Sequence, residues 1–181
     1  MDLSWDAIAS KVVWSGRFPV LVDRIRSRED GREYDYTYLG ITGGAVCVLA
    51  LDEMDQAICV RQYRHPSGQV LLELPAGHLE PDELPASCAH REFEEETGLR
   101  LGSLRSLGSF MPVPALSRFR MHMFLGSELS EGVSDLDDTE ILEVIRVPIE
   151  ELREQVINDQ HDNAGLTYTV LLASQRGLLP Q

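Results

Sequence analysis

The chain has 181 residues, of which 43% are hydrophobic and 25% charged, and this is the composition of a folded globular protein. The length fits one domain with a short extension, and its core needs no disulfide or metal to stabilise it. The net charge of −14, from 30 acidic and 16 basic residues, disfavours nucleic acids and anionic membranes as partners. A small anionic substrate remains compatible with this charge wherever basic residues gather locally.

Three features of the sequence, its apolar stretches, its first residues and its cysteines, indicate a cytoplasmic protein. The longest unbroken apolar stretch, residues 45–51, is too short to span a membrane. The first six residues are acidic and lack the basic start of a secretory signal. Cys47, Cys59 and Cys88 are odd in number and have apolar neighbours, so we expect reduced cysteines in the core of a protein that works in the cytosol.

The first part of the chain is predicted to be an N-terminal β arm over residues 1–40. Apolar residues in 12–22 indicate an extended segment, and residues 23–33 are predicted to form a charged turn centred on Asp30-Gly31. Tyrosines alternate with polar residues at positions 34–38, which is the periodicity of a strand.

Residues 41–181 are predicted to form the main domain. Two apolar segments joined by the turn 52–56 indicate a β-hairpin. The predicted strands of this domain are residues 45–51, 57–63, 70–74, 106–111, 121–125 and 141–147. The predicted helices are residues 85–97, 148–156 and 164–175, the first with Pro85 in its first turn and Gly98 just beyond its end. This mixed order predicts an α/β fold in which helices cover both faces of a sheet.

The helix predicted at 85–97 carries an unusual group of acidic residues. At 100° per residue, Glu92, Glu95 and Glu96 share one face, next to a core-facing stripe that includes Phe93, whereas Glu94 is expected to face solvent. Three carboxylates at this spacing repel one another. A solvated acidic face is one interpretation. A bound divalent cation is the other, and oxygen ligands of this kind suit Mg²⁺ or Mn²⁺.

The segment from Gly77 to Leu99 resembles the Nudix box, G-x5-E-x7-R-E-U-x-E-E-x-G-U, in which U is an aliphatic or bulky apolar residue. The matching positions are Gly77, Glu83, Arg91, Glu92, Phe93, Glu95, Glu96, Gly98 and Leu99. Phe93 is a mild departure, because this position is more often aliphatic. A match of this length by chance has a probability below about one in a million.

The resemblance implies a Nudix α/β/α sandwich with a mixed sheet and hydrolysis of a nucleoside diphosphate linked to another group. It implies that Glu92, Glu95 and Glu96 are metal ligands, together with the carbonyl group of Ala76.

The same resemblance gives roles to the residues around these ligands. Glu83 and Arg91 are expected to tie the loop to the helix, and Gly77 to permit a sharp turn. The resemblance also implies that Arg91, Glu95 and Glu96 are catalytic residues. Bound metal ions would neutralise the pyrophosphate and lower the pKa of the attacking water.

Outside the box, the sequence resembles the ADP-ribose and nucleotide-sugar pyrophosphatase branch of the family. The segments that carry this resemblance are residues 61–64, 72–77 and 137–144. The resemblance implies that Arg64 contacts the substrate phosphates and that Glu73 helps to bind metal. The alternatives are that Arg64 forms a surface ion pair and that Glu73 only anchors it.

The acidic loop after the box is expected to supply the general base, and Glu140 is our first candidate, with Asp137 and Asp138 behind it. Pro114 lies where ADP-ribose hydrolases carry a substrate-binding proline. The glycine and the glutamate that often accompany this proline are absent, so the preferred sugar stays open.

The predicted protein is a Mg²⁺-dependent homodimeric enzyme that hydrolyses ADP-ribose or a related nucleotide sugar to a nucleoside monophosphate and a sugar phosphate. The dimer is expected to form through the N-terminal arm. The alternatives are a Nudix hydrolase of a dinucleoside polyphosphate or an oxidised nucleotide, and a non-catalytic nucleotide-sensing module.

Overall fold

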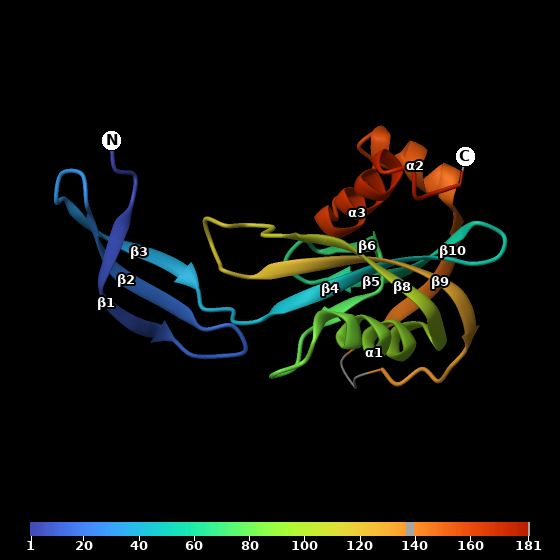
Figure 1. The fold of residues 1–181 in the computed structure, drawn as a ribbon. Helices are drawn as coiled ribbons and strands as arrows, with labels where there is room; N and C mark the ends of the chain where they lie inside the picture. Colours follow the sequence, from blue (N-terminus) through green and yellow to red (C-terminus); the bar gives the residue numbers. More distant parts are fainter. Residues whose placement is uncertain (137–139, 181) are drawn as a thin grey trace. The chain divides into compact units, whose positions relative to one another are not determined.

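The computed structural model describes residues 1–136 and 140–180 and divides the chain into two units. The first unit contains Met1–Thr42 together with Met111–Phe119. The second contains Gly43–Phe110 and the described residues from Arg120 onwards (Figure 1). Each unit has a sheet of its own, so each is described separately.

The first unit is built on a three-stranded antiparallel sheet in the order β1-β2-β3. Its strands are β1 (Trp5–Trp14), β2 (Val20–Ser27) and β3 (Glu33–Leu39). The strand predicted from the alternating tyrosines is therefore confirmed. The predicted charged turn over 23–33 was too long, because β2 continues to Ser27. Its arginines pair with acidic residues across the sheet, as Arg26 does with Glu33 at 2.7 Å, so a highly charged segment is accommodated as strand.

Residues 111–119 pack against this small sheet although they are remote in sequence. The backbone N–H of Leu39 donates to the carbonyl oxygen of Leu116 at 2.7 Å. The hydroxyl group of Tyr36 donates to the carbonyl oxygen of Ala115, also at 2.7 Å. The segment that contains Pro114 thus belongs to the first unit.

The second unit contains a seven-stranded mixed sheet whose main order is β10-β5-β4-β9-β8. In addition, β6 pairs with β5 and β7 pairs with β4. The strands are β4 (Gly44–Leu51), β5 (Gln56–Arg64), β6 (Gln69–Glu73), β7 (Ala76–His78), β8 (Leu99–Phe110), β9 (Arg120–Glu131) and β10 (Leu142–Pro148). Strands β4 and β9 are parallel, and the other pairs are antiparallel.

Strands β8 and β9 are longer than predicted, because they pair along almost their whole length. Their outer residues include exposed polar side chains such as Arg100 and Ser127, which hid the strand pattern in the sequence. The hairpin of β4 and β5 is confirmed.

Among the described residues, three helices cover the two faces of this sheet. They are α1 (Pro85–Thr97), α2 (Ile149–Ile157) and α3 (Ala164–Gln175), and they agree with the predicted ranges to within about one residue. Helix α1 ends at Gly98, whose φ of 69° is the left-handed conformation typical of a helix terminus. Helices α2 and α3 lie on one face of the sheet and α1 lies on the other (Figure 1).

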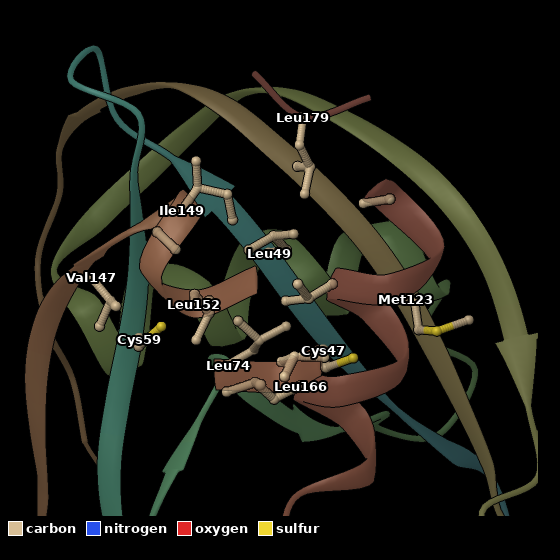
Figure 2. Close-up of a cluster of buried hydrophobic side chains, with 14 of the residues drawn as sticks. Cys47, Leu49, Cys59, Leu74, Met123, Val147, Ile149, Leu152, Leu166 and Leu179 are labelled. Atoms are coloured by element: carbon tan, nitrogen blue, oxygen red, sulfur yellow. The ribbon is translucent and has the colours of Figure 1, made fainter. Parts of the chain in front are cut away.

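Strand β4 divides the core between the two faces, because successive side chains of a strand point in opposite directions. Leu49 packs with Leu152 of α2 and Leu166 of α3 in one cluster (Figure 2). Val48 packs with Phe93 of α1 in the other. The predicted α/β/α sandwich with a mixed sheet, preceded by an N-terminal β arm, is confirmed.

The three cysteines are buried and free, as expected of core residues. Burial raises the pKa of the Cys59 thiol to about 12. Among the described residues, none of the helices has the length and hydrophobicity that a membrane span requires.

Candidate active site

Helix α1 and the short strand β7 hold the predicted acidic residues of the second unit. Phe93 and Ala89 are fully buried and fix the rotation of α1 against the sheet. This rotation brings the carboxylates of Glu92 and Glu96 against the backbone of β7. Core packing of one stripe of the helix therefore positions the neighbouring acidic stripe.

Arg91 joins the loop that precedes α1 to the acidic face of the helix. Its Nε and Nη2 atoms donate to the two carboxylate oxygens of Glu83 at 2.9 and 2.8 Å. Its Nη1 atom donates to Glu92 at 2.8 Å and to Glu95 at 3.0 Å. Hydrogen bonds from Arg91 lower the pKa of Glu83 to about 2. One guanidinium group thus holds three carboxylates close together.

Gly77 is required for a reason that differs from the predicted one. It lies in β7 and does not have a positive φ, so no sharp turn depends on it. Instead, a Cβ atom at this position would overlap the carboxylate of Glu92. The glycine therefore gives a side chain of α1 close access to the backbone of β7.

Glu96 is the most buried carboxylate of the helix, with only 4% of its surface exposed. One of its oxygens accepts a hydrogen bond of 3.0 Å from the backbone N–H of Ala76. Burial raises the pKa of Glu96 to about 8, and the charges of Glu92 and Glu140 act in the same direction. A nearby cation would relieve this unfavourable burial of negative charge.

Arg64 and Glu73 form a bidentate ion pair beside this group. The Nε–Oε1 distance is 2.8 Å and the Nη2–Oε2 distance is 2.6 Å. The Glu73 side chain is 5% exposed, whereas that of Arg64 is 44% exposed. The hydrogen bond to Glu73 raises the pKa of Arg64, and the charges of Glu96 and Glu140 add to this effect. The ion pair therefore lies close enough to the carboxylates of Glu96 and Glu140 to interact with them.

The other predicted site residues are Glu140, Pro114 and the secondary base candidates at positions 137 and 138. Glu140 is half-buried and interacts electrostatically with Arg64, Glu92 and Glu96. Pro114 lines a cavity of about 200 Å³ in the first unit, together with tyrosines of β3. The secondary candidates for the base, residues 137 and 138, lie outside the described residues.

Glu94 was expected to face solvent, but its side chain forms hydrogen bonds that hold the segment after β9. It accepts a hydrogen bond of 2.8 Å from Arg100 and one of 3.3 Å from the backbone N–H of Val133. Ser134, which the sequence did not single out, donates through its hydroxyl group to the carbonyl oxygen of Glu95 at 2.8 Å. These contacts join residues 133–134 to the end of α1, and only the folded structure reveals them.

The donors at this site fit a divalent cation. As they stand, no three Asp, Glu, His or Cys side chains of residues 1–136 and 140–180 are arranged to hold a metal ion. Arg91 occupies the space between Glu92 and Glu95. However, among the described residues the site gathers six carboxylates and two guanidinium groups. The carboxylates are Glu73, Glu83, Glu92, Glu95, Glu96 and Glu140, and the guanidinium groups are Arg64 and Arg91. Such an excess of oxygen donors and negative charge suits a hard cation.

The chain is similar to several known proteins in sequence and in fold. The chain is 36% identical to an ADP-ribose pyrophosphatase of Bacillus subtilis over 129 residues, which cover 70% of each chain. It is 33% identical to a methanol dehydrogenase activator of Bacillus methanolicus over 134 residues, which cover 71% of this chain and 72% of that one. A crystal structure of an ADP compounds hydrolase superposes with a TM-score of 0.85 over 97% of both chains, at 19% identity, which shows the shared fold.

The family described as NUDIX domain matches residues 41–168, a range that includes every described residue of the acidic cluster. Members of this family generally use divalent metal ions. The chain belongs to the Nudix family of pyrophosphohydrolases.

Proposed function

We propose that this enzyme hydrolyses the pyrophosphate bond of ADP-ribose or a related nucleoside diphosphate sugar, releasing a nucleoside monophosphate and a sugar phosphate. The similarity to the ADP-ribose pyrophosphatase of Bacillus subtilis supports this substrate class. Mg²⁺ is the proposed metal, because all the carboxylates of the cluster offer hard oxygen donors. The buried free cysteines support a cytoplasmic location.

The observation that carries the proposal is the position of Arg64 next to the acidic cluster. A pyrophosphate needs positive charge on its oxygens, and the carboxylates of α1 need positive charge as well. Arg64 remains half-exposed while Glu73 holds its guanidinium group in one orientation. A preorganised cation of this kind stabilises developing negative charge without reorganisation during the reaction.

The residues around the scissile bond have separate roles in this proposal. Bound metal ions would neutralise phosphate oxygens and lower the pKa of the attacking water. Glu92, Glu95, Glu96 and the carbonyl group of Ala76 would hold the metal. Arg91 holds the carboxylates of α1 in position relative to the preceding loop. Glu140 accepts the proton of the attacking water.

The proposal predicts that Glu96→Gln lowers kcat by at least about 10²-fold, because the variant removes a metal-binding charge while it keeps the shape of the side chain. The assay measures monophosphate release from a panel of nucleotide sugars, with Mg²⁺ and with Mn²⁺. It also includes a dinucleoside polyphosphate and an oxidised nucleotide as alternative substrates.

Glu154→Gln is the matched control, since it makes the same change at an exposed position of another helix, α2, outside the cluster. Near-normal turnover by a folded Glu96→Gln variant would overturn the assigned role of Glu96. Preferred hydrolysis of an alternative substrate would overturn the substrate class.

A further inference from the structure

A cavity of about 270 Å³ opens beside the candidate active site, on the face of the sheet that α3 covers. Three of its lining residues, Arg64, Glu73 and Ala76, also belong to the site. The backbone of Ala76 lies between the two, because its N–H group donates to Glu96 of α1 while the residue itself lines the cavity. A substrate whose phosphates lie at Arg64 therefore has this cavity within reach.

The walls of the cavity combine apolar surface with unused hydrogen-bond donors. Leu71, Leu74 and Leu166 supply part of the apolar wall. Asn163 caps α3 by accepting a hydrogen bond of 2.9 Å from the backbone N–H of Leu166 through its Oδ1 atom. Its Nδ2 group makes no hydrogen bond with any described residue. The same holds for Nη1 of Arg64, so two donors remain available to a ligand at the cavity.

We propose that this cavity receives the sugar at the far end of the nucleotide-sugar substrate, and that Asn163 is a specificity-determining residue which donates to a sugar hydroxyl group. The inference rests on the proposed function. Apolar walls suit the C–H faces of a sugar ring, and donors suit its oxygens. The volume lies just below the usual range of about 300–1,000 Å³ for complete small-molecule sites, so it fits one sugar ring better than a second nucleoside.

Asn163→Asp tests the donor without removing the helix cap, since asparagine and aspartate cap helices about equally well. We expect the variant to lower kcat/KM for ADP-ribose about tenfold, mainly through a higher KM, the loss expected for one hydrogen bond to substrate. The comparison substrate is ADP methylated on its terminal phosphate, which has the same pyrophosphate bond but no sugar. Its kcat/KM should fall less than twofold. The same change at Asn158, at the end of α2, is the matched control.

Leu71→Phe tests the cavity independently by filling it. The half-buried Leu71 lies in β6, and a larger side chain there would take space from the ligand. We expect kcat/KM to fall more for ADP-glucose than for ADP-ribose, and least for the methyl ester. Calorimetry with ribose 5-phosphate should show weaker binding to both variants than to the unmodified protein.

Equal changes for all three substrates in both variants would overturn the sugar site, even if the unmodified protein hydrolyses ADP-ribose. Failure of the unmodified protein to hydrolyse any nucleotide sugar would instead overturn the proposed function.

Discussion

Gly77 shows how a single residue can serve the site without touching substrate. In Gly77→Ala the new methyl group would overlap the carboxylate of Glu92, which is the movable end of its side chain. The carboxylate can therefore shift away at little cost to the fold, but it then leaves its position in the cluster. We expect kcat to fall at least about tenfold, while the midpoint of thermal unfolding changes by only a few degrees.

Gly44→Ala provides the contrast for this measurement. A Cβ atom there would lie 2.6 Å from the backbone carbonyl oxygen of Arg120, which cannot move independently of β9. This variant should lose stability and keep its activity per folded molecule. A Gly77→Ala variant that is unstable but fully active when folded would contradict our explanation of Gly77.

At the scale of elements, the ion pair of Glu83 and Arg91 connects the loop before α1 to the helix. The pKa of Glu83 is lowered to about 2 in the folded protein, against an ordinary value of 4.5. A lowered pKa means that the pair stabilises the fold fully above about pH 4.5 and progressively less as the pH falls towards 2. Glu83→Gln should therefore be less stable by about 1–3 kcal/mol at neutral pH.

Urea unfolding of both proteins between about pH 7 and pH 3 measures this effect. The difference in the free energy of unfolding should shrink as the pH falls below about 4.5. Glu80→Gln, in the same loop, is a control that leaves the ion pair with Arg91 intact. A difference that stays constant down to pH 3 would show that the charge of Glu83 does not contribute.

Elements with local signals were predictable, and contacts between distant segments were not. Pro85 and Gly98 fixed the limits of α1, because proline suits a first turn and glycine a left-handed terminus. The spacing of Glu92, Glu95 and Glu96 was enough to predict that they share one face of the helix. No local pattern indicated that Glu94 fastens Val133, because that contact depends on where the chain returns after β9.

At the scale of the whole molecule, features that depend on nearby residues were again predictable, and contacts between distant segments were not. The second sheet and its two helical layers follow from the order of strands and helices. The attachment of residues 111–119 to the first unit does not, since it depends on hydrogen bonds such as that from Tyr36 to Ala115 across 79 residues. The proposed sugar cavity is non-local for the same reason, because β6 and α3 both contribute to it.

Strand β1 of the first unit exposes large apolar side chains, and this supports the expectation from the sequence that the chain forms a homodimer through its N-terminal arm. All ten residues of β1 are exposed. Val12 is 59% and Trp14 57% exposed, on a strand at the edge of its sheet. Exposed apolar strands at sheet edges favour association, which removes this surface from water.

Sedimentation equilibrium should therefore give a mass near twice 20.3 kDa. Val12→Asp should shift the mass towards that of one chain, because the interface would have to bury an unpaired charge. Ile157→Asp at the end of α2 is the control, since it places the same charge at another exposed apolar position, which is 71% exposed. Circular dichroism should show that both variants stay folded, as expected for substitutions at exposed sites. A single-chain mass for the unmodified protein, or an unchanged dimer in Val12→Asp, would rule out association through β1.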